Sequence, residues 1–173
     1  VIDLRTLKTY EHNRDFNFLY RCNANYNPNG DISFVYKLIH DSLENPDEQT
    51  PDGLTNLTYF LMCLGYCITG ERCEECAFYI WGPPRAGKSL IINMLYDVLG
   101  EFAGHFNISA ISTQGTNDVQ NFQLASIVDK RVVVSAETDK GTRFDAAKIK
   151  SLTGGEPVTC AFKYKNMFTS RNF

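Results

Sequence analysis

The chain has 173 residues, of which 17 are basic and 20 acidic, so its formal net charge is −3. With 43% hydrophobic and 21% charged residues it is typical of a globular protein, which excludes a disordered or collagen-like chain. No run of about 18 apolar residues is present, which excludes a membrane-spanning helix, and the chain does not start in the basic-then-apolar manner of a secretory leader. We expect no membrane partner. We therefore expect an intracellular, soluble protein. Because Val1 rather than Met stands first, we also expect a piece of a longer chain.

The first seventy residues indicate short strands followed by helices. Asp31 is placed to cap the first helix, and Gly70 is a natural stop for the second, strongly apolar one. We expect residues 1–70 to be a small, mostly helical N-terminal domain. The two extended stretches and two helices predicted there are residues 1–4, 16–22, 31–44 and 54–69.

After Gly70 the pattern alternates between apolar strands and helices, which predicts an α/β domain with a parallel sheet over residues 71–173. A buried type of strand is expected at residues 77–81 and another at residues 131–136. The remaining predicted elements are helices at 90–99 and 144–152 and extended segments at 158–162 and 166–169.

The sequence between the first of these strands and the first helix matches G-x-x-x-x-G-K-[ST], the phosphate-binding loop or P-loop. Its glycines allow backbone N–H groups to turn toward a phosphate, and the following helix adds its N-terminal dipole. Lys88 is expected to bind the outer phosphates of ATP, and Ser89 to bind Mg²⁺. A plain glycine turn is the alternative. The predicted ATP-binding residues are Gly82, Pro83, Pro84, Arg85, Ala86, Gly87, Lys88 and Ser89.

A P-loop enzyme also needs a carboxylate at the end of a neighbouring strand. The apolar strand at residues 131–136 is followed directly by Glu137, and Asp139 lies two residues on. Glu137 is therefore the predicted catalytic and metal-binding acid, with Lys88 as its catalytic partner. A helix-capping or surface glutamate is the alternative.

These features together resemble a known family. The P-loop is followed by Val-Val-Ser-Ala-Glu-Thr at residues 133–138 and by Lys-Ser-Leu-Thr-Gly-Gly-Glu at residues 150–156. This order is similar to the superfamily 3 helicase domain of viral and phage primase-helicases, of the poxvirus and satellite-phage type. The Thr-Gly-Gly segment is the most discriminating part, and the resemblance covers nearly the whole chain.

The resemblance implies a P-loop NTPase of AAA+-like fold that couples ATP hydrolysis to translocation on single-stranded or forked DNA. It implies a ring, most often a hexamer, and a fused or associated primase. If the protein is viral, it would act in the host cytoplasm or at a replication site. The family's γ-phosphate sensor and arginine finger would follow Phe173, since Arg171 and Asn172 lie too close to the hairpin. We therefore expect this chain alone to lack a complete ATPase site.

The resemblance also implies that residues 153–165 form a hairpin that reaches into the central channel of the ring. Lys163 and Lys165 would contact DNA phosphates, and Tyr164 would stack on bases. The basic balance of residues 130–173, with 9 basic and 4 acidic side chains against 8 and 16 in residues 1–129, favours such an anion-binding surface. An exposed edge with solubilising lysines is the alternative.

Three other possibilities remain open from the sequence. A P-loop also occurs in small-molecule kinases, although no Arg-rich lid segment is visible here. A nucleotide-gated DNA-binding scaffold without catalysis would carry the same motif. Finally, four cysteines could form a zinc site, or be incidental thiols, which their surroundings favour. These are Cys63, Cys67, Cys73 and Cys76.

Overall fold

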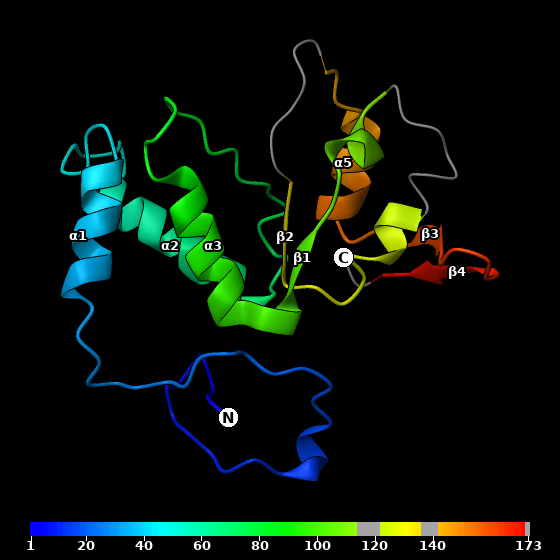
Figure 1. Cartoon of the computed structure of the whole chain (residues 1–173), viewed down its shortest axis with the longest axis horizontal. Helices are drawn as coiled ribbons and strands as arrows, with labels where there is room; N and C mark the ends of the chain where they lie inside the picture. Colours follow the sequence, from blue (N-terminus) through cyan, green and yellow to red (C-terminus); the bar gives the residue numbers. More distant parts are fainter. Residues whose placement is uncertain (114–121, 136–141, 172–173) are drawn as a thin grey trace. The chain divides into compact units, whose positions relative to one another are not determined.

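The computed structural model describes residues 1–113, 122–135 and 142–171 (Figure 1). The chain divides into two compact units. The first, the helical unit, consists of residues 1–69 and 79–101, and the second, the sheet unit, of residues 70–78 and 102–173. This division differs from the predicted boundary at residue 70, because the P-loop and its helix belong with the N-terminal helices.

The helical unit is built from three helices, α1 (Ser33–Ser42), α2 (Asn56–Thr69) and α3 (Lys88–Leu99), preceded by the short 3-10 helix η1 (Arg14–Phe16). Each helix contributes one buried residue to a common core: Ile39, Leu57 and Ile91. Burial of such side chains stabilises a fold by about 1.5–3 kcal/mol each. The contact between Ile91 and the two earlier helices explains why residues 79–101 belong to this unit.

Local sequence explains where these helices begin and end. The Asp31 carboxylate accepts a hydrogen bond from the Ser33 amide (2.9 Å), and hydrogen bonds from Ser33 lower the pKa of that carboxyl. Asp31 thus stands one residue before the N-cap position, which Ile32 occupies. Helix α2 ends at Thr69 and is followed, as predicted, by Gly70, whose φ of 71° lies in the left-handed region. Phe34 of α1 is exposed, whereas Ile39 of the same helix is buried.

The sheet unit opens with a parallel pair of strands. The 3-10 helix η2 (Gly100–Phe102) leads into β1 (Ala103–His105), which pairs in parallel with β2 (Val132–Val134). Strand β2 confirms the strand predicted at residues 131–136, whereas β1 was not predicted. A further 3-10 helix, η3 (Ile108–Ile111), follows β1. One parallel pair is less than the sheet expected of a P-loop NTPase, so that fold class stays a prediction.

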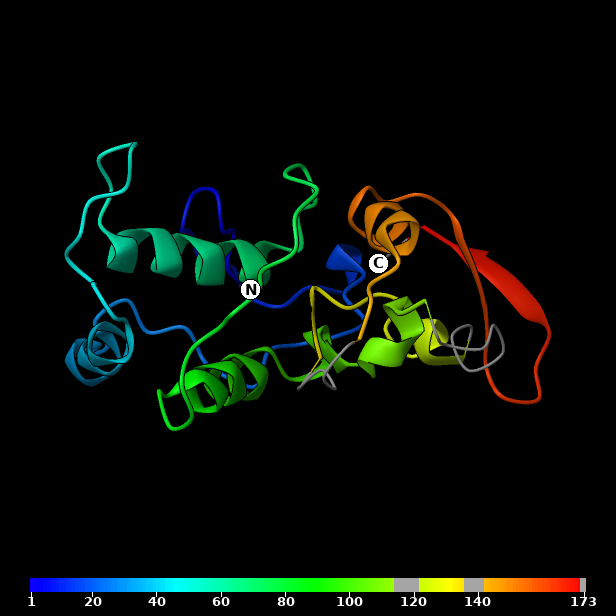
Figure 2. The same cartoon turned by 90° about the horizontal axis from the view of Figure 1, so that it is seen from above.

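The other part of the sheet unit is a helix followed by a hairpin. Helix α5 (Ala146–Thr153) begins at Asp145, whose carboxylate accepts hydrogen bonds from the amides of Ala147 and Lys148. Strands β3 (Val158–Ala161) and β4 (Met167–Ser170) pair antiparallel, with Cys160 opposite Phe168. Figure 2 shows this hairpin, in orange to red, extending away from α5. All three elements confirm the predicted pattern within about two residues.

The sheet unit has its own hydrophobic core. Cys160 of β3 is completely buried and belongs to one cluster with three residues from the segment before β2. Half-buried residues of α5 and both hairpin strands pack against that cluster. The buried members are Leu124, Ala125, Ile127 and Cys160.

Three of the predicted extended segments form no strand in the described structure. Residues 77–81 form no strand. The two described strand pairs are β1 with β2 and β3 with β4, and neither pair includes this segment. The segment is exposed, so the prediction of a buried strand is wrong there. Residues 1–4 contribute only a single bridge, between Ile2 and Thr9, and residues 16–22 form no strand. In the described ranges, no helix is long and apolar enough to cross a membrane.

Candidate functional site

The P-loop lies in the helical unit, where it joins Trp81 to α3. Gly87 is the N-cap of α3 and has a φ of 79°, a conformation that glycine adopts without strain. The first intrahelical bond runs from the Ile91 amide to the Gly87 carbonyl (3.1 Å). The amides before that bond, together with the helix dipole, make this end of α3 electropositive.

The other residue of the loop with positive φ is Arg85 (φ 65°), not Gly82. A Cβ atom built at Gly82 would lie 3.9 Å from Cδ of Lys88, which is an ordinary van der Waals distance. Of the two motif glycines, Gly87 is therefore the one that the local geometry requires. Arg85 and Gly87 have positive φ, and Ala86 between them does not. Such an alternation is typical of the concave backbone turns whose N–H groups bind anions.

Lys88 folds back over the loop. Its ammonium group donates hydrogen bonds to the carbonyls of Gly82 (2.8 Å) and Pro83 (2.7 Å). An ammonium has three N–H donors, so one remains for a ligand while the two carbonyls fix the direction of the side chain. Ser89, in the first turn of α3, is exposed, as a hydroxyl must be to reach a bound ion.

The C-terminal end of α1 lies directly against the P-loop. A Cβ atom built at Gly87 would lie 2.5 Å from Oγ and 3.3 Å from Cβ of Ser42. The Ser42 hydroxyl is itself held, because it donates to the Leu38 carbonyl (2.7 Å). Gly87 is thus required for its conformation and also for the close approach of α1. Sequence reasoning missed Ser42, since no local pattern links residues 42 and 87.

A cavity of about 140 Å³ opens beside the loop, wholly within the helical unit. It is lined by the P-loop and the two residues before it, by the end of α1 with the two residues that follow, and by one residue each of α2 and α3 outside the loop. The lining consists of Ser42, Leu43, Glu44, Phe60, Ile80, Trp81, Gly82, Pro83, Ala86, Lys88 and Ile91.

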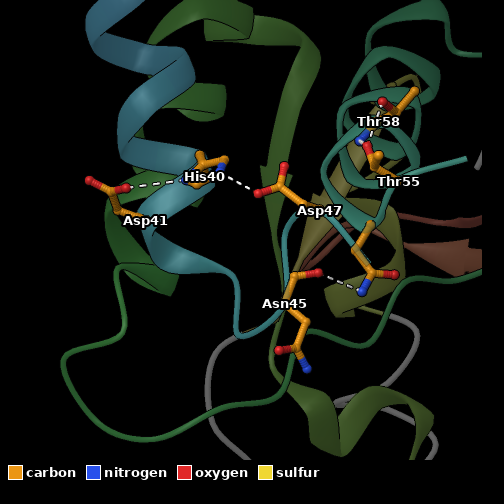
Figure 3. A network of polar contacts seen from close by, with 7 residues as sticks. His40, Asp41, Asn45, Asp47, Thr55 and Thr58 are labelled. Atoms are coloured by element: carbon orange, nitrogen blue, oxygen red, sulfur yellow. Dashed lines mark hydrogen bonds and ion pairs between the residues drawn. The ribbon is translucent and has the colours of Figure 1, made fainter. Parts of the chain in front are cut away.

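A polar network follows the end of α1 (Figure 3). The His40 ring lies between two carboxylates, with Nδ1 3.3 Å from Asp41 and Nε2 3.4 Å from Asp47. The hydrogen bond with Asp41, followed by the contact with Asp47, raises the pKa of His40 above its usual value. The network ties the loop at residues 45–53 to the helix that touches Gly87, and no sequence pattern singles it out.

The predicted acid, Glu137, and Asp139 lie outside the described residues. Strand β2, which precedes them, belongs to the sheet unit, whereas the P-loop belongs to the helical unit. The pairing of Lys88 with Glu137 therefore stays a prediction.

All four residues of the hairpin turn, 162–165, are exposed. A hydrogen bond from the Lys165 amide to the Phe162 carbonyl (3.0 Å) closes this four-residue turn. Tyr164 is 93% exposed and has a φ of 64°, at the turn position that glycine usually occupies. The Lys163 ammonium lies 5.2 Å from the centre of the Tyr164 ring, within the range of a cation–π contact. Lys165 lies 5.8 Å from the ring of Phe162, which stacks on Phe168.

Arg72 is a further residue that sequence reasoning missed. Its guanidinium donates a hydrogen bond to the Arg171 carbonyl (2.5 Å). A Cβ atom built at Gly155 would lie 3.2 Å from the same guanidinium, so the Thr-Gly-Gly turn leaves room for it. Arg72 thereby connects that turn with the end of β4. Only the fold brings together residues so distant in sequence.

The cysteines show no metal site in the described ranges. Cys73 and Cys76 are exposed, Cys63 and Cys67 are half-buried, and none of the four forms a disulfide. Among residues 1–113, 122–135 and 142–171, no group of three or more His, Cys, Asp and Glu residues could hold a metal ion. The four-cysteine zinc alternative is therefore not supported there.

Comparison with known proteins gives a family but no function. No curated protein matches this chain. Residues 80–173 match a family described as a family of unknown function, DUF5906. The matched stretch is more than half of the 173 residues and includes the P-loop, Glu137 and the hairpin turn. The chain therefore belongs to the DUF5906 family.

Proposed function

We propose that this chain is the ATP-binding core of a replicative DNA helicase of the superfamily 3 type. The observation that carries the proposal is the P-loop. Gly87 in the left-handed conformation, Lys88 directed by two carbonyls and an exposed Ser89 all meet at the N-terminus of a 12-residue helix. This combination of backbone amides, helix dipole and cation suits a polyphosphate.

The residues of the loop would divide the work of phosphoryl transfer. Lys88 and the loop amides would hold the outer phosphates of ATP and stabilise the negative charge that develops in the transition state. Ser89 offers a hard oxygen ligand, and Mg²⁺ commonly binds through one or two protein oxygens together with substrate phosphates. Glu137 would complete the metal site or orient the attacking water. When bound, the metal neutralises phosphate charge.

The hairpin supports DNA as the second ligand. Lys163, Tyr164 and Lys165 are presented together at an exposed turn, as cations and a ring that suit phosphates and bases. The family match covers residues 80–173 and so includes both this turn and the P-loop of this chain. In the proposal the protein assembles into a ring, with a primase fused or associated, and acts inside the cell at a replication site.

ATP turnover with different additions tests this proposal. The protein is purified in its assembled form, and hydrolysis is measured alone, with single-stranded DNA, and with candidate small acceptors. Stimulation by DNA supports the helicase. Stimulation by a small acceptor indicates a kinase instead, and ATP binding with no turnover under any condition indicates a nucleotide-gated scaffold. The Lys88→Ala variant serves as the matched control for contaminating ATPases.

A further inference from the structure

The lining of the cavity beside the P-loop combines three kinds of side chain: a cation, an anion and large apolar groups. Lys88 is the only basic residue among the described residues that line it, and Glu44 the only acidic one. Phe60, Ile80 and Trp81 add an apolar wall. Lys88 attracts the anionic part of a ligand, and the apolar residues suit a part of the ligand that carries no charge.

The size of the cavity limits what it can hold. Its volume of about 140 Å³ is smaller than the roughly 300–1,000 Å³ of pockets that enclose whole ligands. It therefore suits one fragment of a ligand, such as a single ring system, while the remainder lies along the loop.

Trp81 is suited to hold such a ring. It is the residue directly before Gly82, it lines the cavity, and yet its side chain is 82% exposed. A large aromatic side chain kept in solvent beside a phosphate-binding loop gains little from folding, but it can cover a flat ring that arrives with a phosphate.

We propose that this cavity binds the base of the nucleotide, by stacking on Trp81 among the apolar lining residues, when the phosphates are held at Lys88. This inference rests on the proposed P-loop function and extends it to the nucleoside part of the substrate. Stacking depends on the π-face that every base has, so the site accepts purine and pyrimidine nucleoside triphosphates alike.

The test separates base binding from phosphate binding. ATP and inorganic tripolyphosphate are titrated by calorimetry, in magnesium buffer, into the wild-type chain and the Trp81→Ala variant. We expect Trp81→Ala to weaken ATP binding on the order of 10-fold or more, as the loss of one stacked base predicts. Binding of tripolyphosphate should stay unchanged, because it has no base.

Two variants control for folding and for general loss of aromatic surface. Trp81→Phe keeps a ring and should restore most of the affinity for ATP. Tyr79→Ala removes an aromatic of similar exposure, 76%, that does not line the cavity, and should leave ATP binding unchanged. Because Trp81 is the only tryptophan in the chain, its fluorescence should respond to ATP but not to tripolyphosphate.

Each outcome decides between the two proposals. Equal ATP affinity in wild type and Trp81→Ala, with tripolyphosphate bound by both, overturns the base site and leaves the P-loop assignment standing. Failure of the folded wild-type chain to bind either ATP or tripolyphosphate overturns both.

Discussion

The P-loop and the hairpin turn both place lysine beside a residue with positive φ, yet they hold the cation in opposite ways. In the P-loop, Gly87 adopts that conformation without strain, and Lys88 turns inward to two carbonyls. In the turn, Tyr164 adopts a positive φ at a cost in conformational free energy, and the ammonium group of Lys163 lies over the exposed ring of Tyr164. The first arrangement fixes a direction for one ligand group, whereas the second offers an adaptable surface to a repeating polymer.

Removing the Lys88 ammonium, which two carbonyls hold in place, should have the largest effect on ligand binding. Lys88→Ala is expected to reduce ATP affinity by about 10- to 100-fold, since a hydrogen bond to a charged group contributes about 1.5–3 kcal/mol. Isothermal titration calorimetry measures the loss, and circular dichroism establishes that the variant is folded. A folded Lys88→Ala protein with full ATP affinity would contradict the P-loop assignment.

Gly87→Ala tests the close approach on which the loop depends. The new methyl group would lie 2.5 Å from Oγ of Ser42, and the left-handed conformation alone costs about 1–2 kcal/mol for a non-glycine residue. We expect lower stability in urea unfolding and weaker ATP binding.

Adding Ser42→Ala to Gly87→Ala removes the oxygen of the clash but not the backbone strain. The double variant should therefore recover part of the stability. Additive effects of the two substitutions would show that Ser42 and Gly87 do not interact.

Substitutions in the hairpin turn should mainly change how strongly DNA binding depends on salt. Lys163→Ala with Lys165→Ala is expected to weaken single-stranded DNA binding and leave ATP binding intact. Each DNA phosphate that a lysine no longer binds lowers the slope of log affinity against log salt by about 0.7, so the slope of the double variant falls by up to about 1.4 per engaged subunit. Fluorescence anisotropy with a labelled oligonucleotide across a salt series measures it. An unchanged slope would identify the turn as a solvated edge.

Tyr164→Gly should separate stability from binding in the same turn. Glycine relieves the positive φ, so the free energy of unfolding should rise by up to about 1 kcal/mol. DNA affinity should fall because the variant has no stacking ring. Tyr164→Asn is the matched control, since asparagine tolerates this conformation and has no ring. A Tyr164→Gly variant that is less stable than wild type would show that the ring contacts outweigh the strain.

The smallest expected effect concerns pH near the P-loop. Asp41 and Asp47 raise the pKa of His40 in the folded chain, so the protonated ring stabilises the fold. This stabilisation is fully present below the usual pKa of histidine and is lost as pH rises through the higher folded value. Urea unfolding from about pH 5.5 to 8.5 should show the decline in wild type, and a flatter profile in His40→Gln. Identical profiles would exclude this contribution.

Features encoded by neighbouring residues could be predicted from the sequence. The apolar run before Gly70 predicted α2, and the lysines between two extended segments predicted the turn of the hairpin. The P-loop motif predicted the start of α3. In each case residues close in sequence set the backbone conformation.

Features that depend on distant contacts could not be predicted. Strand β1 has the sequence Ala-Gly-His, which has little strand propensity, and it forms because β2 pairs with it. The contacts of Gly87 with Ser42 and of Arg72 with Gly155 join residues far apart in the chain. Conversely, the strongly apolar residues 77–81 favour a buried strand, but burial requires neighbouring strands and covered faces.

The contact between Gly87 and Ser42 also has a consequence for folding kinetics. The two residues are 45 positions apart, so the loop between them must close before α1 can support the phosphate-binding backbone. Helices α2 and α3 can nucleate locally and earlier. We therefore expect competence to bind a polyphosphate to arise late in refolding, after helical structure, so that the delay between the circular dichroism signal and ligand binding would measure the docking of α1.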